Sequence, residues 1–118
     1  MSYDIYLNEP STKTSIRFGE PHHLKGGTFV MGGTTEAWLN VTYNYGDHFR
    51  RTLGEKGVRT IYGMTGADSL PLLRQAAWQL KDDVSSDYWA ATEGNAKQAL
   101  LSLIAMAERR PDGIWSGD

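Results

Sequence analysis

The stretch from residue 32 to residue 45 is dense in polar and aromatic side chains suited to binding a ligand. Glu36, Asn40 and Asn44 recur at every fourth position, which places side chains on one face of an α-helix. Amide and carboxylate groups there can hydrogen-bond a polar ligand, although a solvated helix face has the same pattern. Together with flanking residues, they form the first group of candidate binding residues: Thr34, Thr35, Glu36, Asn40, Tyr43 and Asn44.

A second candidate group precedes the last predicted helix and comprises Trp89, Glu93 and Asn95. If Glu36 and Glu93 meet in the fold, the two carboxylates can share acid–base work. The sequence has no GxSxG motif around a serine, so nothing indicates a nucleophile for hydrolysis. We therefore assign no catalytic residue and rank an enzyme behind a binding protein.

Metal and thiol chemistry have little support. The chain has no cysteine, which excludes disulfides, thiol nucleophiles and cysteine metal sites. His22 and His23 are adjacent and cannot easily chelate one ion together, and His48 belongs to no HExxH motif. The sequence predicts neither a metal ion nor a cofactor.

Phosphate binding is a weaker possibility. Segments 32–35, 63–66 and 92–95 place glycine and threonine before predicted helices, whose free N–H groups attract anions. Arg51 and Arg59 are the leading cations for such a site, because a guanidinium matches phosphate oxygens in pairs. Ordinary helix capping explains the same segments, and Arg59 can instead pair with an acidic residue of the 82–87 loop.

Length and charge bound the possibilities further. At 118 residues the chain is one domain, and its net charge of −2 does not suggest general nucleic-acid binding. It contains no apolar run as long as a membrane span and no signal-peptide pattern. We therefore expect a cytoplasmic protein that does not enter a membrane.

The predicted elements give an α+β fold, in which a small antiparallel sheet packs against three helices. Residues 3–7 and 14–18 are predicted to form an N-terminal hairpin, and residues 28–31 a short third strand. The rest of segment 1–33 is loop. Apolar residues at helical spacing, with capping threonines, predict helices over the following ranges, before a tail over 111–118: 34–54, 65–81 and 87–110. Leu100, Leu103 and Ile104 are the predicted core of the last helix.

Four segments resemble a group of small proteins of undefined function from bacterial and phage or prophage genomes. They are GGTTEAWLNVTYNY at 32–45, VRTIYGMTG at 58–66, DYWAATEGNAK at 87–97 and RPDGIWSGD at 110–118. The resemblance implies a small accessory protein acting inside a bacterial host cell, and it lends no catalytic residue. Some small phage proteins resemble inhibitors that cover a defence protein, and others resemble sponges that sequester a nucleotide signal.

Our leading hypothesis is non-catalytic binding of a small polar or nucleotide-like signal of a host defence system. The alternative partner is a host defence protein, which this chain would inhibit by covering it, as anti-CRISPR proteins do. A ligand site can also lie at the interface between copies of one chain, so we keep a homo-oligomer among the alternatives.

Overall fold

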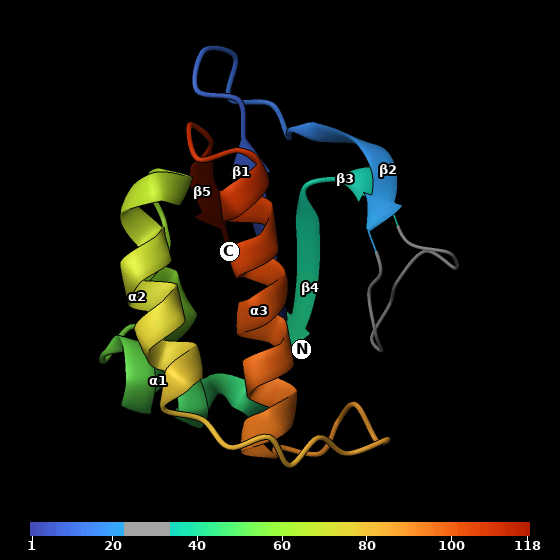
Figure 1. The fold of residues 1–118 in the computed structure, drawn as a ribbon, viewed down its shortest axis with the longest axis vertical. Helices are drawn as coiled ribbons and strands as arrows, with labels where there is room; N and C mark the ends of the chain where they lie inside the picture. The colour runs from blue at the N-terminus through green and yellow to red at the C-terminus, as the bar shows by residue number, and fades with distance from the viewer. Residues whose placement is uncertain (23–33) are drawn as a thin grey trace.

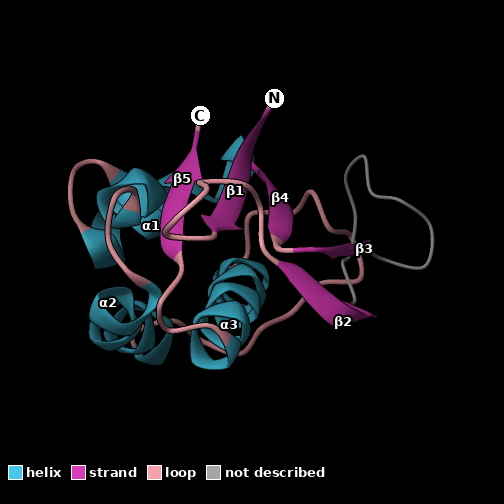
Figure 2. Ribbon diagram, turned by 90° about the horizontal axis from the view of Figure 1, so that it is seen from above, coloured by secondary structure: helices cyan, strands magenta, loops and turns pink. Residues whose placement is uncertain are grey.

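The computed structural model describes residues 1–22 and 34–118, and it shows the predicted α+β fold. Its strands are β1 (Ser2–Asn8), β2 (Arg17–His22), β3 (Thr34–Glu36), β4 (Trp38–Thr42) and β5 (Ile114–Gly117). Its helices are α1 (Gly46–Leu53), α2 (Gly66–Trp78) and α3 (Glu93–Arg109), with short 3₁₀ helices η1 (Tyr43–Tyr45) and η2 (Gly57–Ile61). Helices α2 and α3 lie side by side against one face of the main sheet (Figures 1 and 2).

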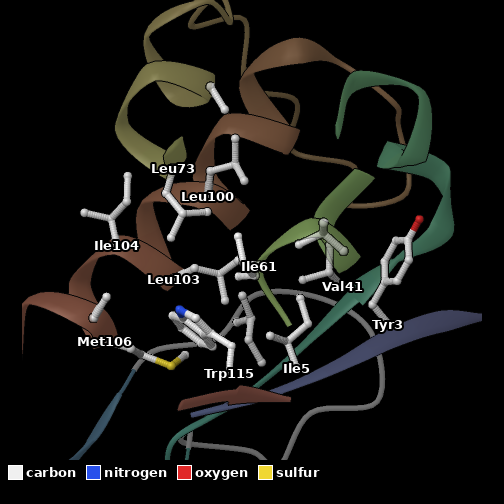
Figure 3. Packing of buried hydrophobic residues seen from close by; sticks show 14 of the residues in the cluster. Tyr3, Ile5, Val41, Ile61, Leu73, Leu100, Leu103, Ile104, Met106 and Trp115 are labelled. Atoms are coloured by element: carbon white, nitrogen blue, oxygen red, sulfur yellow. The ribbon is translucent and has the colours of Figure 1, made fainter. Parts of the chain in front are cut away.

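Strand β1 is the centre of this sheet. It pairs antiparallel with β4 on one side and with β5 on the other. Tyr3, Ile5 and Leu7 alternate along β1 and are buried against the helices, as a period of two requires. The core thus forms between the sheet and the helices, where Ile5 and Trp115 face Leu103 (Figure 3). The buried positions predicted on α3, Leu100, Leu103 and Ile104, are confirmed.

The pairing of the N-terminal strands differs from the prediction. The turn over residues 9–14 does reverse the chain, and Asn8 bridges Ser15. Beyond that bridge β1 pairs with β4, whereas β2 forms a separate two-stranded sheet with β3. Strand β4 is rich in residues that favour strands, namely tryptophan, valine and threonine, whereas β2 carries glycine, glutamate and proline. Strand β4 is therefore the better partner for β1. The predicted strand over 28–31 lies outside the described residues.

The predicted helix over 34–54 is wrong in its first half. Residues 34–42 form strands β3 and β4, and helix α1 begins only at Gly46. Threonine, valine and tryptophan favour an extended chain there, and asparagine is a poor helix former. Leu39 and Val41 are buried in strand β4, whereas Phe49 and Leu53 form the part of the predicted apolar stripe that is helical.

The other two predicted helices exist with shorter bounds. Thr65 caps α2 by accepting a hydrogen bond from Asp68 N at 3.1 Å, and Thr92 caps α3 through Asn95 N at 3.0 Å. Residues 87–92 lie before α3 and form turns, so this helix begins later than predicted. In the described ranges, no helix is both long enough and apolar enough to span a membrane.

The C-terminal tail is also more ordered than predicted, because it supplies β5. Trp115 is buried, and its indole Nε1 donates to Ser69 Oγ of α2 at 2.7 Å. Trp115 N donates to Met64 O at 3.0 Å, so the segment before α2 covers the outer edge of β5. The tail therefore joins the sheet to α2.

Candidate functional site

The predicted binding residues occupy three separate places instead of one helix face. Thr34, Thr35, Glu36 and Asn40 belong to strands β3 and β4. Tyr43 and Arg59 meet at a corner beside β1. The remaining predicted residues lie around the segment that links α2 to α3: Asn44, Arg51, Trp89, Glu93 and Asn95.

We call this linking segment, residues 79–92, with the side chains that hold it, the loop anchor. Asn95 is its centre and is 7% exposed. Its Oδ1 accepts from Ser85 N at 2.9 Å, and its Nδ2 donates to Asp87 O at 3.0 Å and Ala90 O at 2.9 Å. Asn44 Nδ2 similarly donates to Trp89 O at 2.9 Å. Both amides therefore bind the protein's own backbone.

Two tyrosines extend the loop anchor to the main sheet. The hydroxyl of Tyr88 accepts from Thr42 N at 2.9 Å and donates to Asn40 O at 3.4 Å, which occupies outward backbone groups of β4. The hydroxyl of Tyr45 donates to Tyr88 O. Burial raises the pKa of Tyr45 and Tyr88. Tyr88 thus satisfies part of a sheet edge that would otherwise be open.

Arg51 and Glu93 also contribute to the loop anchor. Nε2 of His48 donates to Ala91 O at 2.8 Å, which leaves Nδ1 to accept from Arg51 at 2.8 Å. Glu93 Oε1 accepts from Lys81 N at 3.1 Å, and its Oε2 lies 3.7 Å from Arg51. These charged groups fix both ends of the link between α2 and α3.

The helix N-termini considered for phosphate are filled by the protein itself. At α3, Gly94 N donates to Asp83 Oδ1 at 3.0 Å, and a Cβ at Gly94 would overlap the backbone of Asp83. At α2, Gly66 N donates to Gly113 O at 2.7 Å and Ala67 N to Pro111 O at 2.9 Å. Residues 34 and 35 begin a strand. Ordinary capping and chain contacts therefore explain these segments.

Arg59 stabilises the corner formed by β1, η1 and the end of β5. Its guanidinium lies 5.0 Å from the Tyr3 ring centroid and 5.8 Å from that of Tyr43, and its Nε donates to Asp118 O at 2.7 Å. Its described partners are therefore not in the 82–87 loop. Burial and Asp118 raise the pKa of nearby Tyr62, whose hydroxyl is buried without a described hydrogen-bond partner.

The main sheet has a second face, turned away from α2 and α3 (Figure 2). Polar and aromatic residues of β1 and β4 share this face. Asp4 Oδ1 accepts from Trp38 Nε1 at 3.0 Å and from Asn40 Nδ2 at 2.9 Å. The same amide nitrogen donates to Ser2 Oγ at 2.7 Å. We call Asp4, Tyr6, Glu36, Trp38 and Asn40 the sheet face.

Aromatic rings and acidic groups occur together on the sheet face. The rings of Tyr6 and Trp38 are stacked, with centroids 6.5 Å apart and planes 18° apart. Burial raises the pKa of Tyr6, with further contributions from the negative charges of Asp4, Glu36 and Asp118. Arg17 lies opposite Glu36 in the smaller sheet and places a cation beside these acidic groups.

Sequence reasoning missed Asp4, Tyr6 and Trp38 as functional candidates. Asp4 and Tyr6 alternate with the buried residues of β1, so that pattern did signal that they share the other face. Trp38 fits the apolar spacing of the predicted helix over 34–54, and its true direction follows only from the strand. Asn40 was predicted, although for a helix face that does not exist.

The structure does not bring Glu36 and Glu93 together. Glu36 ends β3 near one end of the main sheet, whereas Glu93 begins α3 at the opposite end (Figure 1). The acid–base work that would require these two carboxylates to meet therefore has no support in the fold. Within residues 1–22 and 34–118, no cluster of histidine and acidic side chains is arranged to hold a metal ion.

Comparison with protein-family models, curated proteins and solved structures finds no match to this chain.

Proposed function

We propose that this protein is a small phage-type accessory protein that acts in the bacterial cytoplasm by binding, without catalysis. Its ligand is a small planar polar molecule with a nucleobase-like ring, such as a nucleotide-like signal of a host defence system. The observation that supports this proposal best is the stacked pair Tyr6–Trp38 beside the Asp4–Asn40 hydrogen-bond network.

The aromatic pair suits a flat ring. Bases stack on exposed aromatic side chains, and each such contact stabilises binding by about 1–3 kcal/mol. Trp38 is half-buried, and its indole N–H is already fixed by Asp4 at 3.0 Å, so the ring is held in place before a ligand arrives. A held ring loses little side-chain freedom on binding, which favours affinity.

The acidic groups indicate which part of the ligand the sheet face recognises. Carboxylates accept hydrogen bonds and cannot donate them when ionised, so Asp4 and Glu36 suit amino groups on a ring. The same negative charges disfavour a phosphate close to Tyr6. We therefore expect the base to contribute more to binding than the phosphate, and any phosphate to lie toward Arg17.

Inhibition of a defence protein is the second candidate function. Trp78 at the end of α2 is 86% exposed and Trp89 in the loop anchor is 51% exposed. Exposed tryptophans are common energetic centres of protein interfaces. In this alternative, the loop anchor holds Trp89 in place for a protein partner, and the sheet face binds no small ligand.

Calorimetric titration with matched nucleosides, nucleoside monophosphates and cyclic dinucleotides tests the leading proposal. We expect binding of a ring-bearing ligand whose affinity falls at least about tenfold in Trp38→Leu, the loss of about one stacking contact. Asp4→Asn keeps one acceptor oxygen and removes the negative charge, so it should weaken the binding of ligands that carry amino groups. Trp89→Leu is the matched control. The proposal would be contradicted if Trp89→Leu lost as much affinity as Trp38→Leu, or if Trp38→Leu bound the ligand as tightly as the wild type.

A further inference from the structure

The outer face of the α2–α3 pair carries apolar side chains on the side away from the main sheet. The two helices run antiparallel next to each other (Figure 1). Trp78 is 86% exposed on α2 and Leu101 is 41% exposed on α3. Pro71 and Ala105 are exposed on the same two helices. Trp78 and Leu101 lie on two neighbouring helices of one layer, and exposed apolar side chains that gather on one surface mark interaction sites.

Two polar contacts between α2 and α3 show that these residues lie at similar heights along the helix pair. Arg74 on α2 contacts Glu108 on α3 at 2.8 Å, and Lys97 Nζ of α3 lies 3.4 Å from Leu80 O just beyond α2. Trp78 and Leu101 both lie between these two contacts along their helices. Trp78 follows Arg74 by four residues on α2, and Leu101 precedes Glu108 by seven on α3, so each pair lies on one face of its own helix. The ion pair between Arg74 and Glu108 joins the two faces.

We propose that this face, the helix patch of Pro71, Arg74, Trp78, Leu101, Ala105 and Glu108, binds a second copy of the same chain. In a twofold contact the same patch meets itself, so it must be complementary to itself. The helix patch meets this condition because it holds one positive and one negative side chain, Arg74 and Glu108, each about half exposed.

Charge distinguishes the helix patch from the other exposed tryptophan surface. Trp89 lies next to Asp87, in a segment that also contains Asp82 and Asp83. Two copies that met through that segment would bring like charges together, which is unfavourable. In the helix patch, each Arg74 would meet the Glu108 of the other copy as well as the Glu108 of its own chain, and Trp78 would pack on Leu101 and Ala105 of the other copy. This dimer uses the layer opposite the sheet face and leaves that face accessible.

Sedimentation equilibrium from micromolar to millimolar protein tests the dimer. We expect a monomer–dimer equilibrium, and Trp78→Lys should raise its dissociation constant by about 30-fold or more, as for a tryptophan at an interface centre. Because Trp78 is exposed, this change leaves folding intact. Trp89→Lys is the matched control and should dissociate no dimer. A wild-type monomer at all concentrations, or a dimer that survives Trp78→Lys, would overturn the proposal.

Charge reversal gives a second, independent readout. Arg74→Glu and Glu108→Arg should each weaken self-association, because each makes the helix patch carry two like charges. An equimolar mixture of the two variants should associate again, because opposite patches then meet. Exposed ion pairs contribute little to folding, so both variants should remain folded. If the mixture did not associate, Arg74 and Glu108 of different copies would not meet, and the proposed twofold contact would be wrong. Ligand titration of the sheet face is separate, since its residues lie outside the helix patch.

Discussion

Two buried asparagines show how differently the loop anchor and the sheet face use the same side chain. Asn95 is 7% exposed and Asn40 is 5% exposed. Asn95 binds three backbone groups of the segment that it holds. Asn40 instead donates to the side chains of Ser2 and Asp4, which can turn toward water or a ligand. A buried amide therefore indicates structure or function according to what it binds, and not according to its burial.

The largest effect should come from Asn95. Replacing it with alanine removes three hydrogen bonds and leaves Ser85 N, Asp87 O and Ala90 O without that partner. At about 1 kcal/mol for each bond, Asn95→Ala should lower the free energy of unfolding by about 3 kcal/mol. Chemical denaturation measures this. Gln98→Ala, at an exposed position of the same helix, should stay within about 0.5 kcal/mol. A similar small loss for Asn95→Ala would show that the loop anchor is not held as described.

Tyr88 should have the next largest effect, since its hydroxyl joins the loop anchor to β4. Tyr88→Phe removes the acceptor for Thr42 N and should destabilise the fold by about 1–2 kcal/mol. Amide hydrogen exchange at Thr42 should also become faster, because its N–H loses its partner. Tyr6→Phe on the sheet face is the matched control and should leave Thr42 exchange unchanged. If exchange at Thr42 were unchanged in Tyr88→Phe, the Tyr88 hydroxyl would not join the loop anchor to the sheet.

A smaller loss of stability is expected for Asn40. Asn40→Ala should lower the free energy of unfolding by about 1 kcal/mol, because Ser2 and Asp4 can find water instead. The same change should disturb Asp4 and Trp38 and so weaken ligand binding at least several-fold. Thermal unfolding and calorimetry on one sample measure both quantities. A loss as large as that of Asn95→Ala would make Asn40 structural and remove the distinction between the two regions.

The loop-anchor tyrosines Tyr45 and Tyr88 should not affect the pH dependence of stability near neutral pH. At alkaline pH they should make the free energy of unfolding fall. Burial raises the pKa of Tyr45 and Tyr88 above the ordinary value of 10.0. The unfolded chain then releases these protons at lower pH than the folded chain does, so their stabilisation is complete below about pH 10 and decreases above it. Tyr45→Phe should reduce the slope of this decrease, as urea titrations at several alkaline pH values can show. An unchanged slope would mean that Tyr45 ionises equally in both states.

The sequence predicted the fold class and the helical core, because those depend on strong local patterns. Thr65 caps the helix that its position predicted, and Leu103 is buried as its spacing required. The stretch over 34–45 misled because Trp38, Val41 and Tyr45 fit a helical stripe by coincidence. A strand beside β1 buries Leu39 and Val41 instead, and this depends on pairing with distant residues.

The candidate site was harder to predict for the same reason. Asp4, Trp38 and Asn40 converge only when β1 and β4 pair, with Asp4 directly opposite Asn40. Asn44 and Asn95, from the two predicted groups, do converge on the segment before α3, but their partners are backbone groups of residues 85, 87, 89 and 90. Side-chain type indicates hydrogen-bonding capacity and cannot indicate whether the protein's own backbone uses it.

Native mass spectrometry of protein purified from a bacterial host tests the central claim most directly, namely that the sheet face binds a ligand and the loop anchor is structural. Wild-type protein should retain a small molecule, and the exposed loop-anchor variant Trp89→Leu should retain it equally. Trp38→Leu should lose it while keeping its fold. A ligand kept by Trp38→Leu and lost by Trp89→Leu would contradict the account, as would wild-type protein that carries a captured host protein and no small molecule.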